Sequence, residues 1–178
     1  PFSRAAADRL EKMDVPAYKI GSGECNNYPL IEHIADFGKP IILSTGMNDI
    51  DSIRSSVEIF RNKNIPFALL HTTNIYPTAN NLVRLSAMTQ LQDEFPDAVV
   101  GLSDHTIGNF ASILATSMGA AAIEKHFTLN RSDGGVDSSF SLEPEEMKSL
   151  VKETKEAFSA LGPTSFSRSS VEEGNKVF

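Results

Sequence analysis

Cysteine, long apolar runs and basic clusters are scarce or missing in this chain of 178 residues. Cys25 is its one cysteine, which excludes a disulfide framework; we expect it to pack as a small apolar group in a reducing compartment, the cytoplasm. No stretch approaches the ~18 apolar residues of a membrane-spanning helix, so we expect no membrane association. No basic run exceeds two residues and the net charge is −7, which predicts no nucleic-acid partner.

A short apolar run, a polar loop and a segment of helical periodicity recur in this order along the chain. The apolar runs predict strands over residues 17–20, 40–43, 67–70, 99–102 and 121–123. The intervening and flanking segments predict helices over residues 1–13, 29–37, 50–63, 82–95, 107–118 and 143–161. Asp49 and Asp51 stand where the cap of a helix is expected. The chain therefore consists of consecutive βα units.

Strands that are apolar on both faces and joined by helices belong in a parallel sheet covered by helices. Such an α/β sheet is either doubly wound or a (β/α)₈ barrel. Polar residues follow every predicted strand, at 21–24, 44–47, 71–74, 103–105 and 124–126. A barrel brings all strand ends to one rim, whereas a doubly wound sheet gathers its ligand at one switch point. This pattern favours the TIM barrel.

The chain is too short for a complete barrel, which takes ~250 residues and eight strands. We predict an incomplete (β/α)₈ domain of about five βα units over residues 1–161, belonging to a larger enzyme that has about three further units. Residues 162–178 are rich in Ser and lose periodicity. They predict a linker toward a further domain.

Side chains two residues apart on a strand project to the same side. This parity places Ser103 with His105 at the fourth strand end and Glu124 with His126 at the fifth. The two strands are neighbours in a barrel, so the imidazoles can meet and form a divalent-metal site with positions open to water and substrate. Spacing alone leaves a structural role for each histidine equally open.

Lys19 lies in an apolar strand and needs an anion if its ammonium is buried. That anion is Glu24, a carboxylate on a neighbouring strand, or the carboxylate or phosphate of a ligand. The Gly21–Gly23 and Ser44–Gly46 loops offer hydroxyls and backbone N–H groups that can hold phosphate oxygens. Parity places Lys125 on the side opposite to His126, so we expect it to be structural.

Five segments resemble the sialic acid synthase family in order and spacing. They are KIGSGECNN at 19–27, ILSTGM at 42–47, HTTNIYPT at 71–78, GLSDHT at 101–106 and EKHFT at 124–128. The resemblance implies a (β/α)₈ barrel followed by an antifreeze-like domain, working as a domain-swapped homodimer. It also implies a transferase that condenses phosphoenolpyruvate with an N-acetylmannosamine-like aldehyde sugar. The products are a nine-carbon 2-keto acid and phosphate.

The same resemblance implies roles for particular residues. Those implied to hold phosphoenolpyruvate are Lys19, Ser22, Ser44, Asn74 and Ser103. Tyr76 and Asp137 would contact the N-acylated amino sugar, and Gly135-Val136-Asp137 stands where the family commonly has Gly-Pro-Asp. His105 and His126 would bind Mn²⁺ or Mg²⁺. Glu24 would be the catalytic acid–base group, and Lys19 would act with it by orienting phosphoenolpyruvate.

Two other functions remain open on the sequence. One is a metal-dependent aldolase or another phosphoenolpyruvate-using barrel enzyme, which would share the paired histidines and the lysine. The other is an inert fragment that binds sugar or phosphate. For these 178 residues alone we expect no activity. The sequence does not select between N-acetylmannosamine and the diacetamido sugars that lead to legionaminic- or pseudaminic-type acids.

Overall fold

The computed structural model describes residues 1–166 and 169–175 and contains one parallel sheet of five strands in sequential order. The strands are β1 (Tyr18–Ile20), β2 (Ile41–Ser44), β3 (Phe67–Thr72), β4 (Val99–Asp104) and β5 (Ile123–Lys125). They curve through 208° as an open half-barrel. The predicted incomplete TIM barrel is confirmed.

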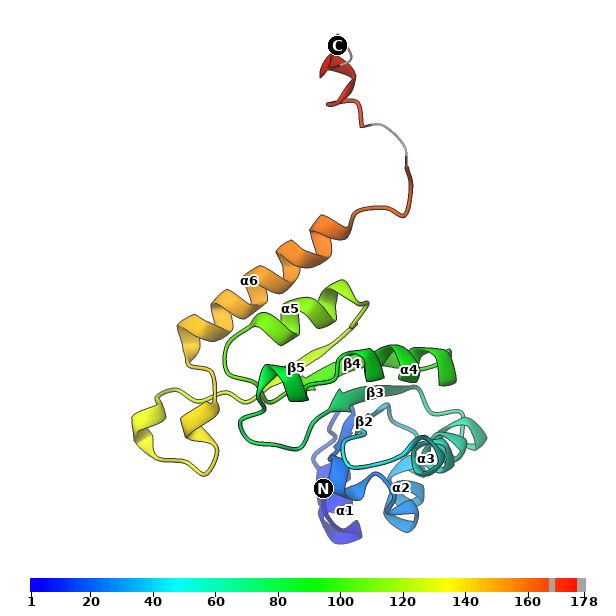
Figure 1. The fold of residues 1–178 in the computed structure, drawn as a ribbon. Helices are drawn as coiled ribbons and strands as arrows, with labels where there is room; N and C mark the ends of the chain where they lie inside the picture. The colour runs from blue at the N-terminus through cyan, green and yellow to red at the C-terminus, as the bar shows by residue number, and fades with distance from the viewer. Residues whose placement is uncertain (167–168, 176–178) are drawn as a thin grey trace.

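Helices alternate with the strands along the chain (Figure 1). They are α1 (Arg4–Lys12), α2 (Tyr28–Ala35), α3 (Ile50–Asn62), α4 (Ser86–Glu94), α5 (Phe110–Ser117) and α6 (Pro144–Leu161). Helix α1 precedes β1, and α6 lies beside α5 at the β5 end of the sheet. Short 3₁₀ turns are η1 (Ser22–Glu24), η2 (Asn80–Leu82), η3 (Arg131–Asp133), η4 (Ser138–Phe140) and η5 (Glu173–Asn175). Short loops between parallel strands and helices impose this layered arrangement.

Side chains of the sheet alternate between two faces. Ile20, Leu43 and Leu69 are fully buried in a core shared with the helices. Ile42 and Leu70 have the opposite parity and line the concave side. Cys25 is also fully buried in the helix-side core, and burial raises the pKa of its thiol to about 12. It packs as a small apolar group, as predicted.

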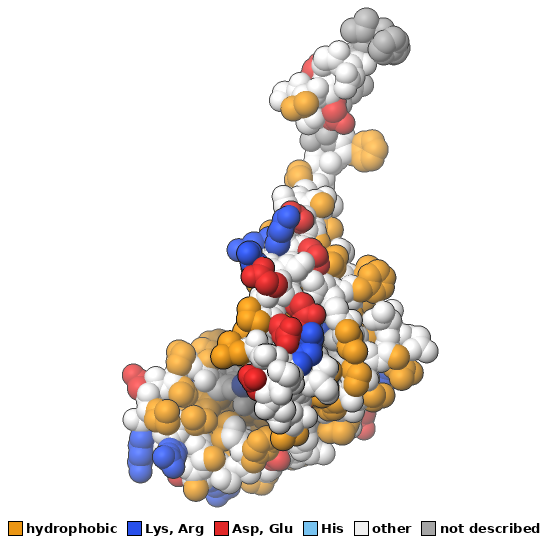
Figure 2. Space-filling view, turned by 90° about the vertical axis from the view of Figure 1, so that its left-hand side faces the viewer, with side chains coloured by type: hydrophobic (Ala, Val, Ile, Leu, Met, Phe, Trp, Pro, Cys, Tyr) orange, Lys and Arg blue, Asp and Glu red, His pale blue; other side chains and the backbone are white. Residues whose placement is uncertain are grey.

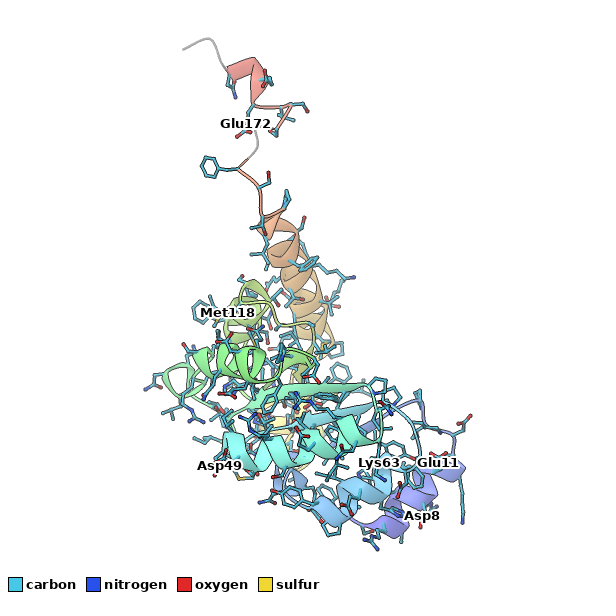
Figure 3. All side chains as sticks on the ribbon, turned by 90° about the vertical axis from the view of Figure 1, so that its right-hand side faces the viewer. Asp8, Glu11, Asp49, Lys63, Met118 and Glu172 are labelled. Carbon is cyan, nitrogen blue, oxygen red and sulfur yellow. The ribbon has the colours of Figure 1, made fainter. Side chains whose placement is uncertain are left out.

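Polar caps fix where several helices begin. The Asp49 carboxylate accepts from the Ser52 N–H at 2.9 Å at the start of α3, which confirms the predicted cap. Figure 3 shows Asp49 at this end of α3, far from Lys63 and Glu11. At the start of α6, Glu143 and Glu146 form a reciprocal capping box ahead of the helix. The loop ends above the sheet are thereby held in defined positions.

Two predicted helices begin later than the periodicity indicates. The helix predicted from residue 82 begins at Ser86 because Arg84 has a left-handed backbone with φ 54°. The helix predicted from residue 107 begins at Phe110 because Gly108, with φ 79°, breaks the segment before it. Left-handed residues cannot continue a right-handed helix. The apolar pattern therefore extends beyond the helix itself.

The last strand also lies further along than predicted, at Ile123–Lys125 instead of 121–123. Ala121 and Ala122 already hydrogen-bond to β4, through Ala121 N to Val100 O and Leu102 N to Ala122 O, each at 2.9 Å. The regular pairing then continues through Glu124 and Lys125. The prediction identified strands as runs of apolar residues, and the polar side chains of Glu124 and Lys125 do not belong to such a run.

The described part of the segment predicted as a linker leaves α6 and leads away from the sheet (Figure 1). All of residues 162–166 and 169–175 are exposed. The remaining positions of that prediction, 167–168 and 176–178, lie outside the described residues. Within the described chain, no helix has the length and apolar character that crossing a bilayer requires.

Candidate active site at the carboxyl ends of the strands

Lys19 is at the centre of a polar cluster on the concave face. Its ammonium donates to Ser44 Oγ at 2.9 Å and lies 3.3 Å from Glu124 Oε1. Ser103 Oγ donates to the same Glu124 oxygen at 2.7 Å. The cluster joins β1, β2, β4 and β5, with one cation facing hydroxyls and one carboxylate. The ammonium and the two hydroxyls can give up these hydrogen bonds to one another and to Glu124, and donate to the oxygens of an anionic ligand instead.

The Lys19–Glu124 ion pair can form only because the sheet is curved. β1 and β5 are the two edge strands, and four spacings of ~4.8 Å would separate them by ~19 Å in a flat sheet. Their side chains nevertheless meet at 3.3 Å. Glu124 is therefore the anion that Lys19 requires, and Glu24 is not its partner.

Ser22, Gly46 and Asn74 form a second polar group beside this cluster. Ser22 Oγ accepts from the Gly46 N–H at 3.1 Å. Asn74 Oδ1 is buried and has no hydrogen-bond partner among the described residues. A Cβ placed on Gly46 would overlap Asn74 Oδ1 and lie 3.0 Å from Ser22 Oγ. Asn74 Oδ1 can thus accept a hydrogen bond from a donor that enters the site, and its Nδ2 can donate one.

His105 and His126 meet above the neighbouring strands, as their parity predicts. Their ring centroids are 5.3 Å apart, with an interplanar angle of 70°. His105 Nδ1 donates to the Thr73 carbonyl at 2.8 Å; a carbonyl can only accept, so Nδ1 carries the proton. Burial lowers the pKa of His105, which keeps the ring neutral. Its Nε2 therefore presents a lone pair.

These two imidazoles fit a divalent cation. His126 Nδ1 lies 3.5 Å from Asp137 Oδ2, a carboxylate neighbour typical of metal-binding histidines. Within residues 1–166 and 169–175, no group of three or more His, Cys, Asp or Glu side chains is arranged to hold an ion. The described chain would contribute two nitrogen ligands to such a cation, one from each histidine.

Aromatic side chains form a wall next to the histidines. The Tyr76 ring lies 4.2 Å from that of His105 and 5.7 Å from that of Phe140, centroid to centroid. Burial, followed by the charges of Asp137 and Glu124, raises the pKa of the Tyr76 hydroxyl. Tyr76 and Asp137 therefore both lie against the imidazole pair, where a second substrate would meet the cation.

Glu24 occupies η1, directly after β1. Its carboxylate accepts from Asn27 Nδ2 at 2.6 Å, within its own loop. Among the residues predicted for the site, Glu24 is the one that belongs to none of the three groups within the described chain. The other predicted residues fall into the three groups described above.

Glu124 and Thr73 are site residues that sequence reasoning did not select. Glu124 shares the parity of His126 and could have been identified from the need of Lys19 for an anion. The Thr73 carbonyl gives no sequence signal, because any residue at that position has one. Only the approach of the β3 loop to β4 shows its part in orienting His105.

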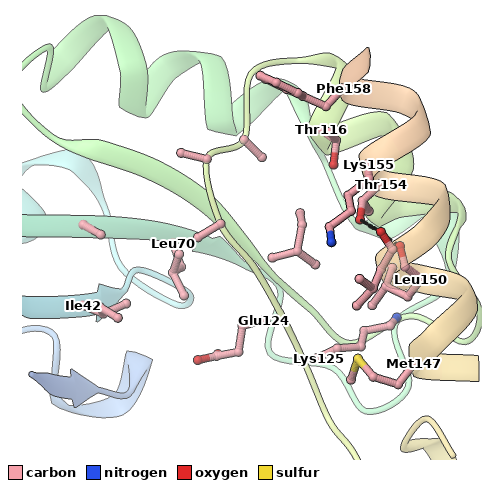
Figure 4. A pocket seen from close by; sticks show the side chains of 16 residues that line it. Ile42, Leu70, Thr116, Glu124, Lys125, Met147, Leu150, Thr154, Lys155 and Phe158 are labelled. Carbon is pink, nitrogen blue, oxygen red and sulfur yellow. Dashed lines mark hydrogen bonds between the residues drawn. The ribbon is translucent and has the colours of Figure 1, made fainter. Parts of the chain in front are cut away.

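A groove of about 790 Å³ opens between the concave face of the sheet and α6 (Figure 4). Its lining is mainly apolar and includes Ile42, Leu70, Leu150 and Phe158. Figure 2 shows hydrophobic side chains spread over this face of the molecule, around a recess. The groove lies beside the Lys19 cluster, because Glu124 belongs to its lining.

Comparisons with known proteins agree with this geometry. A model of the NeuB family matches residues 1–165. The N,N'-diacetyllegionaminic acid synthase of Legionella pneumophila is 40% identical over 166 residues, covering 90% of this chain and 46% of that protein. The human N-acetylneuraminate-9-phosphate synthase is 36% identical over 157 residues, covering 88% of this chain and 44% of that protein.

Among solved structures, the crystal structure of the N-acetylneuraminic acid synthetase of Leptospira borgpetersenii superposes with a TM-score of 0.93. It is 35% identical, and the match covers 98% of this chain and 61% of that one. The chain spans about half the length of the curated relatives that it matches.

Proposed function

This chain belongs to the NeuB family, and from that premise we propose that it forms part of the catalytic barrel of a sialic-acid-type synthase. The enzyme condenses phosphoenolpyruvate with an N-acylated amino sugar in its aldehyde form. The observation that carries the proposal is the convergence of Lys19, Ser44 and Ser103 beside the paired histidines at one rim. A cationic and hydroxyl-rich subsite next to two imidazoles fits an anionic three-carbon acid beside a polarised aldehyde.

The reaction forms one C–C bond and replaces the C2–O bond to phosphate with a C2–O bond to the oxygen of water. The enol carbon of phosphoenolpyruvate attacks the aldehyde carbon, and the aldehyde oxygen takes a proton and becomes a hydroxyl. Water adds to the resulting cationic C2, and collapse of this adduct releases phosphate and leaves the 2-keto acid. Lys19 holds the acid with its enol carbon facing the aldehyde, which contributes through positioning.

We assign proton transfer at the added water to Glu24, because a carboxylate can orient and deprotonate water at C2. His105 and His126 are assigned to a Mn²⁺ or Mg²⁺ ion, which supplies Lewis-acid polarisation of the aldehyde oxygen when bound. Tyr76 and Asp137 are assigned to the sugar, since both lie against the imidazole pair. Ser22 and Asn74 are assigned to phosphoenolpyruvate with the Lys19 cluster.

The proposal extends to the assembly. We assign residues 162–178 to a linker that joins the barrel to an antifreeze-like domain, and the full-length protein to a domain-swapped homodimer in the cytoplasm. The support is the family membership and the exposed course of the described residues after α6. Light scattering of the full-length protein should give the mass of a dimer.

The activity is tested with the full-length protein, Mn²⁺, phosphoenolpyruvate and a panel of N-acylated amino sugars. We expect inorganic phosphate and a nine-carbon 2-keto acid in equal amounts, measured by phosphate assay and NMR. A keto acid formed when pyruvate replaces phosphoenolpyruvate, with no phosphate released, would identify an aldolase instead. Binding of phosphoenolpyruvate with no product for any sugar would refute the assigned reaction.

Replacing Glu24 with Gln in the full-length protein should abolish turnover and leave Mn²⁺ binding unchanged. The amide keeps the side-chain shape and an acceptor for Asn27, but it cannot take a proton. Steady-state rates and Mn²⁺ titration measure the two effects. A variant that keeps a near-normal rate would remove Glu24 from the chemistry.

A further inference from the structure

A buried ion pair that the proposed chemistry does not involve lies behind the two histidines. Lys125 Nζ is 2.9 Å from Asp104 Oδ2, and the two side chains are 3% and 0% exposed. Figure 4 shows Lys125 and Glu124 leaving β5 in opposite directions, as their parity predicts. Removing two charged groups from water costs free energy. The cost is offset only if the carboxylate oxygens and ammonium protons that do not take part in the ion pair form other hydrogen bonds.

The loop after β4 and helix α5 use that capacity. Asp104 Oδ1 accepts from the Thr106 N–H at 2.8 Å, and Oδ2 accepts from Ser112 Oγ at 2.6 Å. Lys125 Nζ also donates to the Thr106 carbonyl at 2.5 Å and to Thr106 Oγ1 at 3.4 Å. The network therefore ties β4, its following loop, α5 and β5 into one unit.

Both histidines are flanked by members of this network. His105 lies between Asp104 and Thr106 in the chain, and His126 directly follows Lys125. On its other side His105 is held by the loop after β3, because its ring bonds to Thr73 O and its carbonyl accepts from Thr78 N, each at 2.8 Å. The Lys125 ammonium is thus a side-chain link between the strands that carry His126 and His105.

We propose that the Lys125–Asp104 pair is a positioning device for the cation site, which holds the two imidazoles at the separation that lets both bind one divalent ion. The inference rests on the proposed function, which supplies the ion. Groups behind metal-binding histidines commonly change metal affinity about 10- to 100-fold when removed. Here the pair acts through the backbone next to each ring instead of through the ring nitrogens.

The test is Mn²⁺ binding to the full-length protein carrying Lys125→Met together with Asp104→Asn. The double variant removes both charges, keeps similar volumes and leaves no unpaired buried charge, so its folding can be expected. We expect the Mn²⁺ Kd, measured by electron paramagnetic resonance, to rise at least ~10-fold. The nitrogen modulation that two bound imidazoles produce should weaken in parallel.

A matched control is Arg61→Met together with Asp97→Asn. It removes a bidentate ion pair of 2.7 and 2.9 Å between α3 and the turn before β4, and the Mn²⁺ Kd should stay unchanged. The single substitution Lys125→Arg in the wild-type protein keeps the cation. Its Mn²⁺ Kd should be close to that of the wild type. Circular dichroism establishes that each variant is folded.

The outcomes separate the two proposals. A folded Lys125→Met/Asp104→Asn variant with the wild-type Kd and wild-type nitrogen signal would overturn the positioning role and leave the proposed function intact. Failure of the wild-type protein to bind Mn²⁺ would overturn both the cation assignment and this inference. An equal loss of affinity in the Arg61 control would reduce the effect to general destabilisation and overturn the positioning role.

Discussion

At the residue scale, the candidate phosphoenolpyruvate subsite leaves no room at Gly46. A side chain there would overlap Asn74 Oδ1 and lie 2.9 Å from the Thr72 carbonyl, so the two strand ends can approach only around a glycine. The neighbouring Gly23 has open space at its Cβ position. A side chain therefore fits at position 23 and does not fit at position 46.

We expect Gly46→Ala to lower kcat/KM for phosphoenolpyruvate more than tenfold, because Asn74 and Ser22 must move. Overpacking of this kind costs about 1–3 kcal/mol of stability, which thermal melting measures. Gly23→Ala is the matched control and should change neither quantity appreciably. Unchanged kinetics in Gly46→Ala would show that Asn74 does not contribute to substrate binding.

His71 predicts a pH dependence of stability. It is buried, its Nε2 donates to Val83 O at 2.7 Å, and burial lowers its pKa. The unfolded chain binds a proton near pH ~6.5 while the folded chain does not, so the free energy of unfolding falls as the pH drops below about 6.5. Burial acts in the same direction on His105.

His71→Gln retains a donor at the position of Nε2 and removes the titration. Urea unfolding of the variant between pH 7.5 and 5 should show a shallower loss of stability than the wild type, with a remainder due to His105. Stability that declines equally in both proteins would contradict the assignment of His71.

At the element scale, α6 depends on its cap. Glu146 Oε2 accepts from the Glu143 N–H at 2.8 Å and also binds Arg131 of η3, while Leu150 is the buried side chain of the helix. With so little apolar burial along its length, the first turn contributes a large share of what holds the helix in place.

Glu146→Ala should therefore lower the free energy of unfolding by about 1 kcal/mol, the usual value of a cap. Glu145→Ala is the control, because Glu145 is exposed. Among the described residues, its one ion-pair partner is Lys148, whose Nζ lies 3.4 Å from Glu145 Oε2. An exposed pair of that kind contributes roughly 0–1 kcal/mol and usually a few tenths. Equal effects of the two substitutions in urea titrations would exclude the capping box as a stabilising feature.

At the scale of the whole molecule, the half-barrel formed by the described residues has two unpaired strand edges, at β1 and β5. The groove beside β5 is apolar and open. Phe158 lines it with 71% of its surface exposed, whereas Phe166 is fully exposed outside it. Unpaired edges next to apolar surface favour association between chains.

A polypeptide of residues 1–178 alone should therefore self-associate, as size-exclusion chromatography with light scattering would show. Phe158→Ser should reduce the associated fraction, because it makes the groove more polar. Phe166→Ser changes a more exposed phenylalanine outside the groove and should have no effect. A monomeric wild-type polypeptide at high concentration would contradict this reading of the groove.

Much of the site followed from local sequence pattern. Strand alternation fixes which residues share a face, so the meeting of His105 with His126 and the opposite directions of Glu124 and Lys125 could be predicted from parity. The cap at Asp49 followed in the same way, because a helix start is determined by residues within one turn. The sequence also defined five βα units with polar strand ends, and these define the fold class.

Other features depended on distance in space and not along the chain. The pairing of Lys19 with Glu124 requires curvature accumulated over the whole sheet, and no local pattern encodes it. The same holds for the contact of Gly46 with Asn74 and for the left-handed turn at Arg84 that shortens α4. The sequence by itself determined which chemical groups each strand end carries; the tertiary structure decided which of them meet, because curvature and loop approach arise only when all the units pack together.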